Sequence, residues 1–196
     1  MSPTVWYTAR SAGIVAYLLL SSSVVLGLSM SARASFPWPR FAVQELHRFL
    51  TIVTAVFIAV HGASLLLDRI VPISVGQELV PFADRYRPFA VALGIVATEL
   101  MAAVGVTNAL RKRLPHRLWR RAHYATIAVW VAATAHGLLA GTDRADPWFL
   151  ALIGMAVASV GLGFLGRFAR NATPAAFGGV AVSAAAAVLA LAFVPQ

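Results

Sequence analysis

The sequence predicts an all-α, polytopic membrane protein that folds as a bundle of six transmembrane helices. Of its 196 residues, 60% are hydrophobic and only 12% are charged, and the mean hydropathy of +0.78 lies outside the range of ordinary soluble domains. The apolar residues form six runs of about 20, the length that a helix needs to cross roughly 30 Å of hydrocarbon. We therefore interpret residues 1–196 as one transmembrane domain.

The six predicted spans follow one another with short polar connections. They cover residues 11–31, 45–67, 88–110, 118–140, 147–166 and 174–194. Helix-breaking or helix-starting residues separate them, because proline and helix-capping side chains favour helix ends. These residues occur at 36–40 (FPWPR), 71–74 (VPIS), 81–88, 111–115 (RKRLP), 146–147 and 171–174 (NATP). A cleaved signal peptide is a competing interpretation of the first span, since Arg10 precedes it and Ala32-Arg33-Ala34 resembles a cleavage site.

Positive charge is distributed unevenly between the two sets of loops. The loops at 32–44, 111–117 and 167–173 are rich in arginine, whereas the opposite loops balance their arginines with acidic residues. The positive-inside rule places the first set in the cytoplasm and both termini outside a multi-pass cell-membrane protein. The net charge of +9 is then explained by loop arginines beside membrane lipid. Nucleic acid is not an expected partner, because the basic residues form no stripe with interleaved aromatics.

Histidine is the residue that any metal chemistry here must use. The chain has no cysteine, which excludes disulfides, iron–sulfur ligation and thiolate chemistry, and it has five histidines. Two of them bracket the apolar segment HRFLTIVTAVFIAVHG, as His47 and His61, and two bracket HYATIAVWVAATAHG, as His123 and His136. Because polar side chains in membrane helices are costly and usually functional, the repeat needs a common explanation.

The spacing of these histidines places them in pairs at two membrane depths. His47 and His61 are 14 residues apart, which is about 21 Å along a helix and only about 40° around it. His123 and His136 are 13 residues apart, or about 20 Å, on a helix that runs parallel to the first. We therefore expect His47 to face His123, and His61 to face His136. The 13-residue spacing of His123 and His136 conflicts with this expectation, because 13 residues rotate by about 220° around an ideal helix, so the two side chains do not share a face. A kink, a π-bulge or an obliquely set heme would accommodate this rotation.

Two imidazoles that meet twice, at two depths, form the arrangement that ligates two low-spin b hemes axially. Zinc is disfavoured, because each pair lacks the third or fourth protein ligand that zinc usually takes. The alternative is that each histidine is a hydrogen-bonded packing residue. A heme-free transporter or scaffold is a further alternative, although small transporters commonly show an inverted repeat and this repeat is parallel.

The pattern H-x13-H followed by H-x12-H, with His-Gly closing both segments at 61–62 and 136–137, resembles the ferric reductase-like transmembrane domain family. That family includes the membrane parts of NADPH oxidases and iron reductases, and bacterial heme subunits related to the membrane partner of methionine sulfoxide reductase. The resemblance covers residues 45–166. It implies electron transfer from a cytoplasmic donor to an outer acceptor, with His47 and His123 on the inner heme and His61 and His136 on the outer one. Reduction of ferric iron, dioxygen or quinone at the outer heme by this chain itself is the alternative.

The resemblance also bears on the electron donor. Oxidases and iron reductases of the family continue into a flavin- and nicotinamide-binding domain. This sequence shows no G-x-G-x-x-G after a strand. We therefore expect a separate flavoprotein or a membrane quinol as the donor, and the sequence leaves open whether the chain is itself an enzyme.

Other side chains are candidates to support the hemes. Heme propionates are anionic and favour arginine forks. Trp130, seven residues after His123, is expected either to fill the space between the two heme depths or simply to pack. Glu99, an acid inside an apolar run, is a candidate acceptor for a ligand imidazole, a proton relay, or a residue bonded to a neighbouring helix. His116 follows a basic loop and is expected at the surface. The candidate arginines are Arg48, Arg117, Arg120 and Arg121 at the inner end, and Arg85, Arg87 and Arg144 at the outer end.

Overall fold

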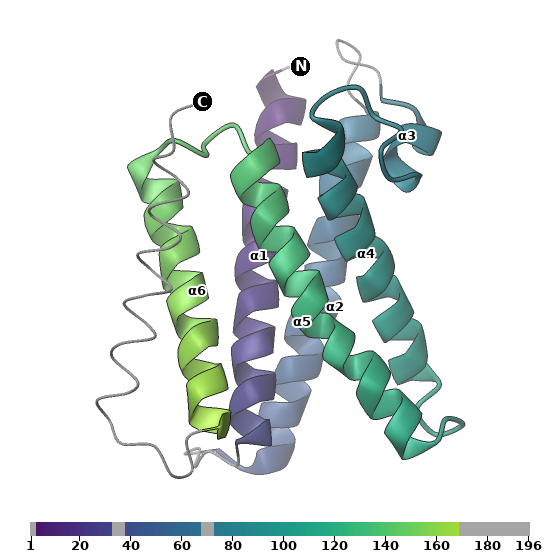
Figure 1. Ribbon diagram of the computed structural model, residues 1–196, viewed down its shortest axis with the longest axis vertical. Helices are drawn as coiled ribbons and strands as arrows, with labels where there is room; N and C mark the ends of the chain where they lie inside the picture. The colour runs from purple at the N-terminus through teal and green to yellow at the C-terminus, as the bar shows by residue number, and fades with distance from the viewer. Residues whose placement is uncertain (1–2, 33–37, 68–72, 169–196) are drawn as a thin grey trace. The chain divides into compact units, whose positions relative to one another are not determined.

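A computed structural model describes residues 3–32, 38–67 and 73–168, and within these ranges the chain forms six α-helices and no strand (Figure 1). The all-α prediction is confirmed for this part of the chain. The helices are α1 (Pro3–Ser31), α2 (Arg40–Leu66), α3 (Val75–Leu79), α4 (Pro88–Ala109), α5 (His116–Ala140) and α6 (Pro147–Phe168).

The first five predicted spans each fall on one of the long helices. Proline explains where three of these begin, since Pro88 and Pro147 are the first residues of α4 and α6, and Pro115 immediately precedes α5. The short helix α3 was not predicted; Ser74 and Gln77 hold it through a reciprocal capping box. The sixth predicted span, 174–194, lies outside the described residues.

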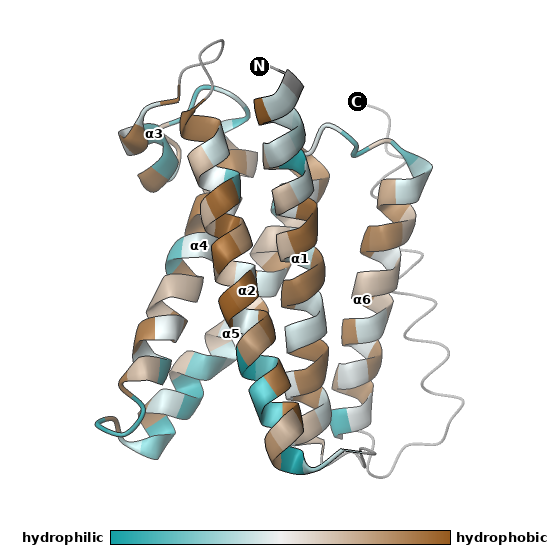
Figure 2. Ribbon diagram, turned by 180° about the vertical axis from the view of Figure 1, so that it is seen from behind, coloured by the Kyte–Doolittle hydropathy of each residue, from teal (hydrophilic) through white to brown (hydrophobic). Residues whose placement is uncertain are grey.

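Within the described residues, four helices are long and apolar enough to cross a membrane. These candidate spans are Thr4–Ser31, Arg40–Leu66, Pro88–Ala109 and Pro147–Arg167. Helix α5, with 25 residues, is also long enough but is less apolar, because it carries three arginines in its first turns and two membrane-depth histidines. Figure 2 shows this difference, with hydrophilic residues gathered at the start of α5 and in the loop before it.

Contacts divide the chain into two compact units. The first comprises Met1–Tyr17 and Val56–Gly141, and the second comprises Leu18–Ala55 and Thr142–Gln196. Helices α1 and α2 therefore contribute part of their length to each unit. In the first unit α4 and α5 pack closely together (Figure 1), and small side chains of α4, such as Ala90 and Ala92, are buried.

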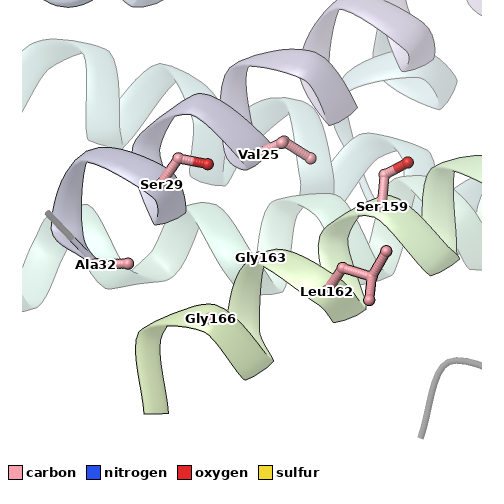
Figure 3. A pocket seen from close by; sticks show the side chains of 7 residues that line it. All are labelled: Val25, Ser29, Ala32, Ser159, Leu162, Gly163 and Gly166. Carbon is pink, nitrogen blue, oxygen red and sulfur yellow. The ribbon is translucent and has the colours of Figure 1, made fainter. Parts of the chain in front are cut away.

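The second unit has its own apolar core and an open hollow beside it. Val43, Ile153 and Val160 are each only 1% exposed. Gly163 of α6 packs against Leu28 of α1, so that an added Cβ would lie 3.1 Å from the leucine Cδ1. The hollow, of about 490 Å³, is lined by two serines and otherwise by small or aliphatic residues. Its lining is Val25, Ser29, Ala32, Ser159, Leu162, Gly163 and Gly166 (Figure 3).

Candidate functional site

His61 of α2 and His136 of α5 come together in the first unit. Their ring centres are 6.4 Å apart and their planes are inclined by 81°. Two imidazoles that ligate one metal ion from opposite sides have ring centres roughly 6 Å apart, because each metal–nitrogen bond is about 2 Å long and each nitrogen lies about 1 Å from the centre of its ring. Among the described residues, no group of three or more His, Cys, Asp or Glu side chains is placed to hold a metal ion. The separation of the two rings therefore fits one iron between two imidazoles.

Both rings are held by main-chain carbonyls. The Nδ1 atom of His61 lies 2.7 Å from the carbonyl oxygen of Ala9, and that of His136 lies 2.8 Å from the carbonyl oxygen of Ala90. A carbonyl oxygen only accepts, so each Nδ1 carries the proton and donates it, which leaves the lone pair on Nε2. Metal-ligating histidines usually show this arrangement, in which the second nitrogen donates to an outer group. The residues present therefore fit axial heme ligation.

His47 has the same arrangement in the second unit. Its Nδ1 atom lies 2.9 Å from the carbonyl oxygen of Ser23 and 3.1 Å from the hydroxyl of the same serine. That hydroxyl is also 3.1 Å from the hydroxyl of Thr51. Donation to the carbonyl again leaves Nε2 as the ligand atom.

His123, in the first unit, is placed by aromatic contacts. Its ring stacks on Trp119 with centres 5.3 Å apart and planes at 20°. The same indole lies 5.6 Å from the ring of His116 and 5.1 Å from the guanidinium carbon of Arg111. Because His47 belongs to the second unit and His123 to the first, the pairing of the inner histidines stays a prediction.

Comparison with known families gives a match over more than half of the chain. The family model described as ferric reductase like transmembrane component matches residues 12–134. The chain belongs to this family. Membership implies a membrane protein that takes part in electron transfer. The match begins within α1, well before residue 45 where the predicted resemblance begins, and it ends two residues before His136. Comparisons with curated proteins and with solved structures give no match.

In this ferric reductase-like chain, α5 contains no π-bulge. All 25 of its residues are α-helical, so His123 and His136 lie about 220° apart around its axis. The bulge considered from the sequence is therefore not the device that reconciles their spacing.

Glu99 does not hold a ligand histidine. Its side chain is exposed on α4, whereas Ala90 and Ile95 of the same helix are buried. The acceptor role considered for it at His47, His61 or His136 is filled by main-chain carbonyls instead. A carbonyl is neutral, so this solution avoids an ionised carboxylate inside the membrane.

The candidate arginines have different surroundings. Arg48 is exposed and lies 3.8 Å from Glu45, and both side chains are about 70% exposed, so this pair contributes little. Arg87 donates to the carbonyl of Leu139 at 2.7 Å and thereby ties the start of α4 to the end of α5. Arg85, Arg117, Arg120 and Arg121 are exposed, and Arg144 is half-buried.

Trp130 is buried on α5, with 8% of its surface exposed. Four residues later the hydroxyl of Thr134 donates to the Trp130 carbonyl. Thr134 also lies 3.1 Å from the hydroxyl of Tyr17, which connects α5 to α1 within the first unit. These contacts place Trp130 in the packed interior, as both of its sequence interpretations require.

Glu78 explains why glycine follows His61. Its Oε1 atom occupies the place that a Cβ at Gly62 would take. Its Oε2 atom is buried and, in the described part of the chain, has no hydrogen-bond partner. Burial raises the pKa of the Glu78 carboxyl. A side chain larger than hydrogen at position 62 would displace the Glu78 carboxyl group from this contact.

Sequence reasoning missed the glycines that lie opposite the histidines. Gly13, Gly27 and Gly94 each contact a histidine ring. A signal for two of them is present in the sequence, because Gly13 and Gly27 are 14 residues apart, the same interval as His47 and His61. Trp119 was also missed, since only the fold brings its ring beside His123.

Proposed function

We propose that this chain carries electrons across the membrane through two b hemes, each held by two histidines. His61 and His136 hold the outer heme, and His47 and His123 hold the inner one. The observation that carries the proposal is the pair of rings 6.4 Å apart, each with its Nδ1 proton donated to a carbonyl. When bound, heme supplies a one-electron couple between ferric and ferrous iron.

The spacing of the ligands supports two sites at two depths. His47 and His61 are separated by 14 residues of the continuous helix α2, or about 21 Å along its axis. Two hemes held at these depths would divide the distance across the hydrocarbon into two shorter intervals. Two histidines for each heme would leave no open iron site, which would favour electron transfer over ligand chemistry.

The basic end of α5 supports a donor on the cytoplasmic side. Six positive side chains are exposed there, before and at the start of the helix that carries His123. Positive loops stay inside, and such a surface attracts an acidic partner at a rate that rises at low salt. We propose a flavoprotein or a membrane quinol as the donor. The six residues are Arg111, Lys112, Arg113, Arg117, Arg120 and Arg121.

The absorption spectrum of the purified full chain tests this proposal. We expect two low-spin b hemes per chain by pyridine hemochromogen assay. We also expect a reduced spectrum that carbon monoxide leaves unchanged, because both axial positions are filled. A strong shift with carbon monoxide would refute bis-histidine ligation. A folded chain that binds no heme, when produced with ample heme, would refute the proposal as a whole.

A further inference from the structure

Three of the four membrane histidines lie against a glycine of a neighbouring helix. In each case the imidazole Nδ1 donates to the carbonyl four residues before that glycine, at 2.7 to 2.9 Å. The arrangement therefore recurs with the same internal geometry in both units. The sets are His61 with Gly13 and Ala9, His47 with Gly27 and Ser23, and His136 with Gly94 and Ala90.

Helix geometry explains why glycine occupies these positions. In an α-helix the carbonyl of residue i−4 accepts from the N–H of residue i. The side chain at position i leans toward the N-terminus and covers the turn that holds that carbonyl. A glycine leaves the carbonyl open from the side, where its second lone pair can accept from another donor. An imidazole can then reach a carbonyl that already serves its own helix.

We propose that Gly13 and Gly94 are positioning residues for the heme ligands, and that Gly27 forms a wider version of the same arrangement that tolerates alanine. Each forms a notch, meaning the space above a helix turn that the absent side chain would fill. The notch admits the ring, fixes the proton on Nδ1 and leaves Nε2 to bind iron. This inference rests on the proposed function. His123 is placed differently, by its stack on Trp119.

The equal spacing of glycines and histidines shows how one pair of helices carries two notches. Gly13 and Gly27 are 14 residues apart on α1, and His47 and His61 are 14 residues apart on α2. Because the two helices run in opposite directions, the first glycine meets the second histidine and the second glycine meets the first. Equal intervals keep both contacts in register.

The notches differ in how tightly they fit, which makes the proposal quantitative. A Cβ added at Gly94 would lie 2.7 Å from Nδ1 and 2.8 Å from Cε1 of His136. At Gly13 the nearest atom, Nδ1 of His61, would be 3.1 Å away, and at Gly27 the nearest atom, Cε1 of His47, would be 3.4 Å away. Alanine must therefore displace His136 the most and His61 by less, whereas the contact at Gly27 is ordinary van der Waals contact and leaves His47 in place.

The test is a series of alanine variants of the full chain, purified from membranes. We expect Gly94→Ala to weaken binding of one heme about 10- to 100-fold, the usual cost of losing an outer-shell partner. In Gly13→Ala the same heme should remain bound with a raised midpoint potential, because weaker donation from Nδ1 makes the ligand less basic. Gly27→Ala should resemble the wild type. The heme retained in each variant reports that the chain is folded.

Two glycines of the same chain provide matched controls. Gly105, on the same helix as Gly94, has nothing within 4 Å of its added Cβ. Gly163 is as tightly packed as Gly13, but against Leu28 instead of a histidine. Gly105→Ala should change neither stability nor hemes adversely. Gly163→Ala should change thermal stability without changing either midpoint potential, which separates packing from positioning.

The outcomes distinguish this inference from the proposed function. An effect that falls in the order Gly94, Gly13, Gly27 supports the notches. Equal effects at the three positions, or an equal effect of Gly105→Ala, would overturn them. A wild type with two hemes and a Gly94→Ala variant with unchanged heme affinity and potentials would overturn the notches alone. A heme-free wild type would overturn the proposed function and the notches together.

Discussion

Replacing His136 with alanine should reduce the heme content from two per chain to one. His136 and His61 form the described pair, with ring centres 6.4 Å apart, so loss of either ring removes half of that ligand set. His47 lies 14 residues from His61 on α2, or about 21 Å along the helix. Sites separated by more than roughly 7–10 Å usually behave independently. The inner heme should therefore stay bound with little change in its midpoint potential.

The assay is heme per chain by pyridine hemochromogen, with redox titration of the heme that remains. His61→Ala should cause the same loss, and the double variant with His136→Ala should lose no more than either single variant, because both residues serve one site. Excess free imidazole should restore part of the lost heme by filling the vacated ligand position. His116→Ala is the matched control, since His116 is exposed at the start of α5. Loss of both hemes from a folded single variant would instead indicate one shared site.

Two further predictions concern the parts of the chain outside the spans. Burial raises the pKa of Glu78 above its ordinary 4.5, so the folded chain keeps a proton that the unfolded chain loses, and stability should fall as pH rises from about 4.5 through the raised pKa. Glu78→Gln should abolish this fall in a thermal melt in detergent. An unchanged dependence of stability on pH in this variant would contradict the burial argument. The chain lacks cysteine, so a single introduced cysteine is the only site that a maleimide can label. With the orientation predicted by the positive-inside rule, Lys112→Cys should react with an impermeant maleimide only from the cytoplasmic side and Ala145→Cys only from outside. The reverse labelling pattern would refute the proposed direction of electron transfer.

The sequence predicted the long helices well, because their signals are local. Runs of about 20 apolar residues and the prolines at 88, 115 and 147 need no tertiary information. Helix α3 has only five residues, too few for a periodic pattern, and its capping box was recognisable only once its place was known. Helix α5 was predicted as an apolar run over 118–140, and its hydropathy is lower than that of the other long helices because of its arginines and histidines.

The meeting of His61 and His136 was predictable from the sequence, and the surroundings of their rings were not. Histidine spacing alone pairs His61 with His136, which the structure brings together. Glu99 was considered as an acceptor because an acid stands out in an apolar run, yet the sequence does not say which face of α4 it occupies. The actual acceptors are main-chain carbonyls, which every residue possesses. A glycine marks a turn at which a carbonyl is open to a neighbouring helix, so Gly13 and Gly27, which are spaced like His47 and His61, are the readable part of the signal.

The choice of carbonyl partners suits ligands placed in a membrane. In many soluble metal sites the second histidine nitrogen donates to a carboxylate, but an ionised carboxylate at membrane depth is costly. The carbonyls that hold His47, His61 and His136 already accept a helix hydrogen bond, so they fix the same tautomer without adding charge or breaking a helix. A neutral acceptor also makes the imidazole less basic than a carboxylate would, which would favour ferrous iron in a heme bound as proposed. Glycine notches thus let a chain with only seven acidic residues orient three of its four membrane histidines.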